Sequence, residues 1–463
     1  MRFLSQLHSR LGDLWWYTAL LFVAQRFGDV INMFVGMWLV PHYVPQTELG
    51  AVLPLTQFVS LVGLPLGVIA IPFMKYLNLY AENGEYGKVK ALLRDAFVWT
   101  GGLAVVTFLI ACYLLPVLFE RVRVPAGSLG VLIVAVSLLG AVAVIFQNAV
   151  QGLKLYSATV WFNVLAAPMR FVLMVVFMPF RALSGYFVGQ GAAPGVTVLG
   201  ALWVLRKRLG RSVKAQPYWK EDGRAMIRYA IPIAALTIIS VVFSSVDTLI
   251  IRHRLSDFES AGYYIITRFS EITSYFGTVF MVFLFPMVAS RVANAKDPKD
   301  ILVKTLYGSA LSGLLFAAFL FFSGSFILGL QDMWNVYQPL VPHMVWMCVL
   351  NIFLMLNSAF STYETARGSF RFLWYVIPIT VVKGVGLYLF TGYSFFEGIL
   401  PAGLISSIAT FNPNRLGFII GAFIVAQALI CACFFLDVFF VHKRNRVAAS
   451  VAESGVDGGR YNG

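Results

Sequence analysis

The sequence contains few charged residues. Only 12% of its 463 residues are Asp, Glu, Lys or Arg, whereas 59% are hydrophobic. A soluble protein of this size has about 25% charged residues. The charges here are concentrated between apolar blocks of about 20 residues, the length that crosses a bilayer as a helix. The low charge content therefore excludes an ordinary soluble domain and indicates a polytopic membrane protein.

Residues that commonly carry out catalysis or bind metals are also scarce. The five histidines lie at the ends of apolar blocks or in loops, far from one another, and the four cysteines lie inside apolar blocks. Cys431 and Cys433 lack the nearby ligands that would complete a metal site. There is no Gly-rich phosphate-binding loop. We therefore expect a protein that is not an enzyme, does not hydrolyse ATP and has no metal site or cofactor.

The net charge of +14 is a second clue to location. In a soluble protein it could indicate nucleic-acid binding, but in a membrane protein it more often reflects basic cytoplasmic loops. We count twelve candidate spans. They are 14–40, 50–74, 96–118, 129–151, 157–180, 182–205, 228–251, 261–290, 305–329, 340–363, 372–393 and 416–440. Nucleic acid is therefore not an expected partner.

The distribution of Lys and Arg predicts the orientation. The two termini and the loops after even-numbered spans, counted with Arg228 at the edge of the seventh span, hold 25 of these residues. The loops after odd-numbered spans hold 6, and 4 lie further inside the spans. Because basic loops stay in the cytoplasm, both termini are expected there. The first block is too long for the apolar region of a cleaved signal peptide, so it is expected to be a retained helix.

The two halves of the chain repeat. The turn 46–50 after the first span corresponds to the turn 257–262 after the seventh, and Asp29, in the first span, corresponds to Asp247. Corresponding features lie 209 to 218 residues apart. Because six spans separate them, the repeats have the same orientation, as in carriers built from two similar lobes. The expected domains are an N-terminal lobe (1–205), a basic cytoplasmic linker (206–227), a C-terminal lobe (228–445) and a disordered cytoplasmic tail (446–463).

Several spans contain polar residues near their centres. A charged side chain there costs about 2.5–3.5 kcal/mol on insertion scales, so it needs a partner or a wet cavity. For Arg26 with Asp29, and for Arg268 with Glu271, two interpretations stay open: pairing at i,i+3, or contact with a ligand. Arg170 and Lys383 have no acid within four residues, which favours a cavity. The sequence thus predicts a cationic cavity between the lobes, suited to phosphate or carboxylate groups.

These features resemble a known family. The first copy of the shared pattern contains Asp29, then Glu48-Leu49-Gly50, then Pro72 and a Lys-rich segment from Gly84. A second copy contains Asp247, Ala261-Gly262, Arg268 and Leu284-Phe285-Pro286. The chain resembles the polysaccharide transporters of the multidrug/oligosaccharidyl-lipid/polysaccharide exporter superfamily, the Wzx-type flippases. The resemblance implies an all-α polytopic membrane protein with about twelve transmembrane helices in two six-helix lobes arranged as a V.

The resemblance also implies a function. It would be the transfer of an undecaprenyl-diphosphate-linked oligosaccharide across the bacterial inner membrane, for surface polysaccharides such as O-antigen of lipopolysaccharide. An H⁺ or Na⁺ gradient would drive it, and membrane lipids, a glycan polymerase and glycosyltransferases would be partners. The implied substrate-binding residues are Arg26, Arg170, Arg268, Lys383, Asn148, Gln151 and Asn357. The implied coupling or gating residues are Asp29, Asp247, Glu271 and Glu364.

Other functions remain open at this stage. A multidrug exporter of the same superfamily would favour an acidic cavity, whereas here the intramembrane cations roughly match the acids. The related flippases of peptidoglycan precursors have fourteen spans, and this chain has Thr56 and Gln57 where a second cation would lie. A membrane polymerase or ligase would need a large outer loop with catalytic Arg and His, and no outer loop much exceeds 20 residues. A purely structural membrane subunit is a further alternative.

Overall fold

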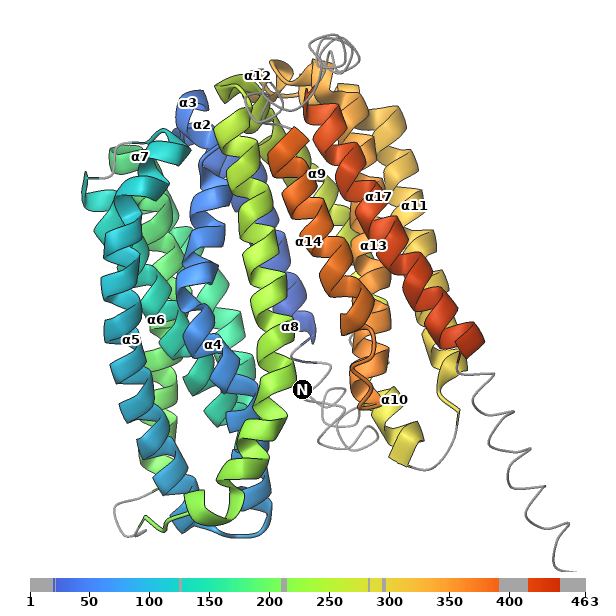
Figure 1. Cartoon of the computed structure of the whole chain (residues 1–463). Helices are drawn as coiled ribbons and strands as arrows, with labels where there is room; N and C mark the ends of the chain where they lie inside the picture. The colour runs from blue at the N-terminus through green and yellow to red at the C-terminus, as the bar shows by residue number, and fades with distance from the viewer. Residues whose placement is uncertain are drawn as a thin grey trace, which may run out of the picture. The chain divides into compact units, whose positions relative to one another are not determined.

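The chain is described here by a computed structural model. The structure describes residues 20, 22–124, 127–209, 215–281, 284–293, 297–390 and 415–441. These residues form helices joined by short turns, and each of the twelve predicted spans overlaps described helical residues (Figure 1). Seven of the described helices are long and apolar enough to cross a membrane. The predicted fold class, an all-α polytopic membrane protein, is confirmed. The tail 446–463 lies outside the described residues.

The described residues form two compact units. Unit 1 comprises Met1–Phe269 with Gln331–Tyr337, and unit 2 comprises Ser270–Leu330 with Gln338–Gly463. The helix of the seventh predicted span thus packs with the N-terminal half of the chain, although the repeat assigns it to the C-terminal lobe. The lobe boundaries inferred from the repeat stay a prediction.

Unit 1 contains the helices of the first seven predicted spans. After a first helix at 22–34, its elements are η1 (Val35–Leu39), α2 (Val40–Tyr43), α3 (Gln46–Leu49), α4 (Val52–Glu82), α5 (Tyr86–Val122), α6 (Gly127–Gly152), α7 (Tyr156–Leu209), α8 (Trp219–Arg254), the start of α9 (Asp257–Met281) and α12 (Asp332–Asn335). In unit 1, α4 packs against α5, α6 and α8, and α6 packs against α7 (Figure 1).

Unit 2 contains the remaining long helices. Its elements are the end of α9, then α10 (Leu284–Ala293), α11 (Lys299–Gly329), η2 (Gln338–Leu340), α13 (Val341–Ala366), α14 (Leu373–Phe390), α17 (Arg415–Leu436) and η3 (Asp437–Val441). Helix α13 packs against both α11 and α17, and α17 also packs against α14. Helix α13 is therefore central to this unit.

Helix α7 contains two of the predicted spans. Its backbone leaves helical geometry at Arg181 (φ −148°, ψ 51°) and Ala182 (φ 10°, ψ −97°), between the spans predicted at 157–180 and 182–205. The second segment then returns along the first. A Cβ on Gly185 would lie 2.5 Å from the backbone of Phe177, and a Cβ on Gly189 would lie 3.1 Å from the carbonyl oxygen of Arg170. Glycine allows this close return.

The first helix ends in a π-helical segment, Val35–Leu39, which is followed by Pro41. Proline has no backbone N–H, so it removes the donor that an i+4 bond to Met37 or an i+5 bond to Gly36 would use. Side chains supply donors instead. The hydroxyl of Tyr264 donates to the Gly36 carbonyl at 2.9 Å, and the indole N–H of Trp334 donates to the Met37 carbonyl at 2.9 Å. The sequence-distant elements α9 and α12 are thereby bonded to the first helix.

The end of unit 1 that is predicted to be cytoplasmic has its own apolar core, built from α4, α5, α6, α7 and the start of α8. The linker docks on this core. The backbone N–H of Gln216 donates to the carbonyl of Gly87 at 3.0 Å, and Tyr218 is 4% exposed. The Tyr80 hydroxyl donates to the Asp222 carboxylate at 2.6 Å. Residues 215–222 of the predicted linker are therefore an ordered part of unit 1.

Candidate functional site

The first helix is the element that three of the predicted cations share. Its Gly28 lies against Ala167 of α7, where a Cβ on the glycine would be 3.6 Å from the alanine Cβ. Further along, the rings of Phe34 and Phe171 meet with centroids 5.9 Å apart. Arg170 therefore lies on the stretch of α7 that packs along the first helix. Arg26 lies on the first helix itself, two residues before Gly28.

Arg26 forms an ion pair with Asp29. The guanidinium Nη1 lies 3.0 Å from the carboxylate, and both side chains are 27% exposed. The guanidinium also lies over the ring of Phe22, 5.3 Å from its centroid. Pairing at i,i+3 is thus the interpretation that the structure supports here. The pair remains half-exposed, so a stronger anion could compete for this arginine.

Arg170 belongs to a polar chain inside unit 1. Its Nη1 donates to the side-chain oxygen of Gln190 at 3.2 Å, and the Gln190 amide donates to the Tyr186 hydroxyl at 2.6 Å. That hydroxyl lies 3.5 Å from the hydroxyl of Thr56. Sequence reasoning missed Gln190 and Tyr186. An amide inside the apolar span 182–205 was the available signal.

Arg268 contacts the first helix at its π-helical segment. A Cβ on Gly36 would lie 2.9 Å from the arginine Cδ, so the aliphatic stem passes directly over this glycine. The guanidinium lies over the ring of Tyr264, 5.2 Å from its centroid. Arg170 directly precedes Phe171, whose ring meets Phe34, and Gly36 lies two residues further on, which is about 3 Å along a helix. Arg170 and Arg268 are thus placed at the first helix within about one helical turn of each other.

In unit 2, predicted polar residues converge on one face of α17. The Lys383 ammonium from α14 lies 5.0 Å from the centroid of the Phe423 ring. One turn later, Gln427 accepts hydrogen bonds from the Asn357 amide at its side-chain oxygen (2.7 Å) and its backbone carbonyl (3.0 Å). Phe423 and Gln427 share a face at i,i+4 spacing. Gln427 was also missed, although it is a polar residue within an apolar span.

Glu364 lies two turns after Asn357 on α13 and is fully buried. One of its oxygens accepts a hydrogen bond from Arg367 at 3.0 Å, and the other has no hydrogen-bond partner among the described residues. The Tyr375 hydroxyl on α14 is also buried without such a partner. A buried carboxylate oxygen with an open acceptor position can receive a hydrogen-bond donor or a small cation.

The remaining predicted residues are Asn148, Gln151, Asp247 and Glu271. The Asn148 amide donates to the Val144 carbonyl of its own helix at 2.8 Å. Gln151 is half-buried at the end of α6, and Asp247 and Glu271 are half-buried in α8 and α9. No site role is tested for any of these residues, so their roles stay predictions.

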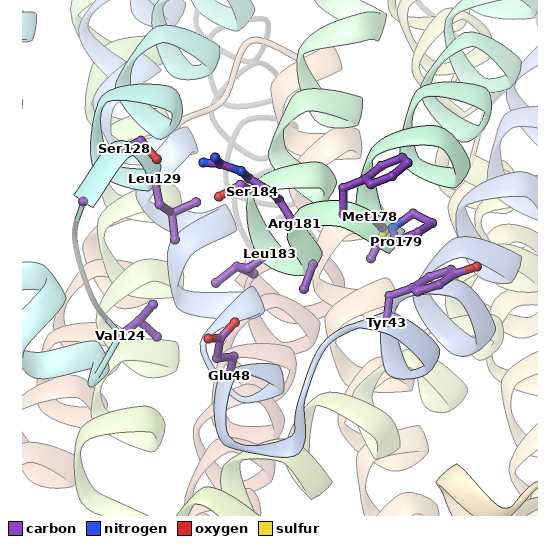
Figure 2. A pocket seen from close by; sticks show the side chains of 13 residues that line it. Tyr43, Glu48, Val124, Ser128, Leu129, Met178, Pro179, Arg181, Leu183 and Ser184 are labelled. Carbon is purple, nitrogen blue, oxygen red and sulfur yellow. The ribbon is translucent and has the colours of Figure 1, made fainter.

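A cavity of about 500 Å³ lies elsewhere, at the α7 kink in unit 1. It is bounded by the turn containing Tyr43 and Glu48, the residues before and within the start of α6, and Met178–Ser184 (Figure 2). None of the eleven predicted site residues lines it. Arg181, at the kink itself, lines the cavity and is exposed.

Comparison with known proteins identifies the fold. No protein-family model and no curated protein matches the sequence. Among solved structures, the chain is similar to an inward-facing multidrug resistance MATE family transporter of the MOP superfamily, with a TM-score of 0.66, 13% identity, and coverage of 91% of this chain and 95% of the other.

Two further structures agree. The lipid II flippase MurJ, in an inward closed conformation, matches with a TM-score of 0.61, 12% identity, and coverage of 91% and 87%. A point mutant of the Vibrio cholerae MATE transporter VcmN matches with a TM-score of 0.62, 14% identity, and coverage of 91% and 95%. At such low identity these likenesses show the fold alone. The chain thus has the fold shared by these MATE transporters and this lipid flippase.

Proposed function

We propose that the protein is a flippase that moves an undecaprenyl-diphosphate-linked oligosaccharide across the bacterial inner membrane by alternating access. The observation that carries the proposal is the placement of cations within apolar helices of both units. Arg26, Arg170 and Arg268 lie on or against the first helix, and Lys383 lies against α17. A cation in a membrane-spanning segment is costly, so its presence there in both units supports an anionic cargo.

The chemistry of the cargo follows from these side chains. A diphosphate accepts charge-assisted, often bidentate hydrogen bonds from guanidinium groups. The amides and hydroxyls of Gln190, Tyr186 and Asn357 are suited to the hydroxyl groups of a glycan. A lipid-linked cargo has a precedent in this fold, because one structural neighbour is a lipid II flippase.

The proposal includes orientation and energy coupling. The excess of Lys and Arg in the loops after even-numbered spans supports an inner-membrane protein with both termini in the cytoplasm. An H⁺ or Na⁺ gradient would drive export. Glu364 is the favoured coupling residue, because it combines full burial with an open acceptor position. Asp29, Asp247 and Glu271 are the other candidates.

The test compares two lysines that both lie near phenylalanine rings. Lys383 lies within the predicted eleventh span and contacts Phe423, whereas Lys299 precedes the predicted ninth span and lies 5.9 Å from the ring of Phe439. We expect Lys383→Ala and Arg268→Ala to abolish surface glycan at normal membrane levels of the protein, and Lys383→Arg to restore part of it. Lys299→Ala should leave glycan export unchanged. Normal surface glycan in both variants would overturn the proposal.

A multidrug exporter is the second candidate. It is favoured by the neighbours, several of which are multidrug transporters, and one of which, DinF-BH, is in complex with a bound compound. The same variants separate the two functions. Loss of drug resistance with intact surface glycan would support the exporter. A polymerase or ligase of the glycan pathway is less favoured, because no observation among the described residues points to it.

A further inference from the structure

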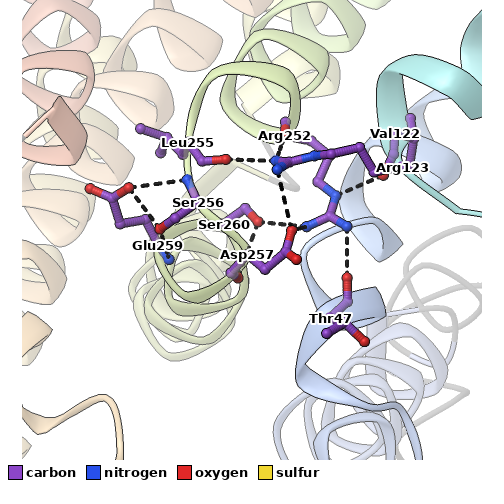
Figure 3. Close-up of polar contacts among 9 residues, drawn as sticks. All are labelled: Thr47, Val122, Arg123, Arg252, Leu255, Ser256, Asp257, Glu259 and Ser260. Carbon is purple, nitrogen blue, oxygen red and sulfur yellow. Dashed lines mark hydrogen bonds and ion pairs between the residues drawn. The ribbon is translucent and has the colours of Figure 1, made fainter.

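Arg252, the first residue after the seventh predicted span, is the centre of a dense hydrogen-bond network in unit 1. It is 1% exposed, yet all of its donor atoms have partners (Figure 3). Its Nε donates to the Val122 carbonyl at 2.8 Å, and its Nη2 donates to the Thr47 carbonyl at 2.6 Å. Its Nη1 donates to Asp257 and Ser260, each at 2.9 Å. A fully buried guanidinium is tolerated only with such complete pairing.

A second arginine makes the reciprocal contacts. Arg123, at the C-terminal end of α5, donates through Nη2 to the carbonyls of Arg252 and Leu255, and lies 3.5 Å from Asp257. Its backbone is left-handed, with φ of 56°. That conformation costs a non-glycine residue about 1–2 kcal/mol, so these bonds also hold a strained helix end in place.

The partners of the two arginines belong to different sequence repeats. Val122, Arg123 and Thr47 lie in the first repeat, whereas Arg252, Leu255, Asp257 and Ser260 lie in the second. The turn that contains Thr47 and the turn that contains Ser260 are the two corresponding turns of the repeat. They also touch directly, because a Cβ on Gly50 would lie 2.8 Å from the Ser260 Cβ. Each repeat therefore donates an arginine to backbone carbonyls of the other.

We propose that Arg252 and Arg123 form a latch that joins the outer turns of the two repeats and must open in each transport cycle. This rests on the proposed function and its orientation, in which these turns face outward. When the repeats part, Arg252 loses the carbonyls of Thr47 and Val122 but keeps Asp257 and Ser260, which belong to its own repeat. Water then replaces the lost acceptors. The guanidinium thus remains paired in both states, which makes the opening reversible.

The first test measures whether the latch closes the outer turns. Leu49 is 2% exposed beside the latch, so a cysteine there reports its opening. In a variant in which the four native cysteines are replaced by alanine, Leu49→Cys should react slowly with a membrane-impermeant maleimide on intact cells. Arg252→Lys and Arg123→Gln should each increase the rate at least about tenfold, because each removes a hydrogen bond from a charged donor. Arg123 is half-exposed, so Arg123→Gln tests the latch even if Arg252→Lys does not fold.

A matched control changes a network within one repeat. Glu259 accepts hydrogen bonds from the backbone and hydroxyl of Ser256, and both residues belong to the second repeat. Glu259→Gln should therefore leave the labelling of Leu49→Cys unchanged. Equal labelling of the parent, Arg123→Gln and Arg252→Lys proteins would overturn the latch, as would labelling only from the cytoplasmic side of inverted vesicles.

The second test asks whether opening is required for transport. A cleavable thiol cross-linker between Thr47→Cys and Ser260→Cys joins the two turns, since both residues bond the Arg252 guanidinium. Cross-linking should stop export of surface glycan or of drug, and cleavage of the linker should restore it. Export at the same rate by the cross-linked protein would overturn the latch. The labelling of Leu49→Cys does not depend on the cargo. If the glycan proposal fails, the labelling result therefore still tests the latch.

Discussion

The hydrogen bond between Tyr80 and Asp222 is predicted to hold the linker on unit 1. Tyr80 is 2% exposed, and its hydroxyl donates to a carboxylate at 2.6 Å. A hydrogen bond to a charged group contributes about 1.5–3 kcal/mol. Tyr80→Phe removes the bond and keeps the ring, so the free energy of opening of residues 215–226 should fall by this amount. The open population should then rise by about 10- to 100-fold.

Limited proteolysis measures this opening. The docked segment contains Lys220 and Arg224, and trypsin cleaves them only when the start of α8 detaches from its core. Tyr80→Phe should accelerate this cleavage by the same 10- to 100-fold in detergent-solubilised protein. Tyr86→Phe is the matched control, because its side chain is 42% exposed and lies at the start of the next helix. If trypsin cleaved Tyr80→Phe less than about threefold faster than Tyr86→Phe, the Tyr80–Asp222 bond would not hold the linker in place.

The docking of residues 215–226 is expected to weaken in alkali. Burial, followed by the interactions with Asp222, raises the pKa of Tyr80, and burial with the neighbouring Asp95 raises the pKa of Tyr218 to about 12. In the unfolded chain a tyrosine has a pKa of about 10. Below that pH the stabilisation is fully present, and it is lost as the pH rises from about 10 through 12. Tyr218→Phe should reduce this loss, as measured by cleavage of residues 215–226 across this pH range with a protease that is active in alkali.

Two further changes test the two polar groups. Gly36→Ala places a methyl group 2.9 Å from the Cδ of Arg268, so it should displace the arginine. Export should then fall several-fold at normal membrane levels of the protein. Gly28→Ala is the control and should be tolerated, because its methyl group makes only an ordinary contact at 3.6 Å. Gln427→Leu removes the side-chain acceptor of the Asn357 amide and keeps the backbone carbonyl acceptor. It should cost about 0.5–1.5 kcal/mol of unfolding free energy in detergent, and an unchanged midpoint would contradict the described bond.

Much of the fold could be predicted from hydropathy and Lys/Arg placement, because the membrane requires apolar helices of fixed length. The boundary between Pro179 and Leu183 was placed correctly, although the chain there is one continuous helical run with a kink. The compact units were not predictable. Apolar patterning shows which residues enter the membrane, but it does not show which helix packs against which neighbour.

The site was predicted less completely, for a similar reason. Arg252 was counted as an ordinary outer-loop charge, although it is almost completely buried. Its partners are mainly backbone carbonyls, and no residue type in the sequence reveals a carbonyl acceptor. The pairing of Arg26 with Asp29 was foreseeable, since i,i+3 neighbours on a helix meet. The contact of Arg268 with Gly36 joins residues more than 200 positions apart, and local spacing cannot predict it.

The π-helical end of the first helix has a consequence for synthesis. The carbonyls of Gly36 and Met37 receive their hydrogen bonds from Tyr264 and Trp334, which follow 228 and 297 residues later. A ribosome adds about 5–20 residues per second, so the Met37 carbonyl waits about 15 to 60 s for its donor. During that interval the nascent helix has unsatisfied backbone groups that lipid cannot bind. This helix is thus completed only after both of its later donors have been synthesised, and translocon or chaperone contacts during this interval should centre on it.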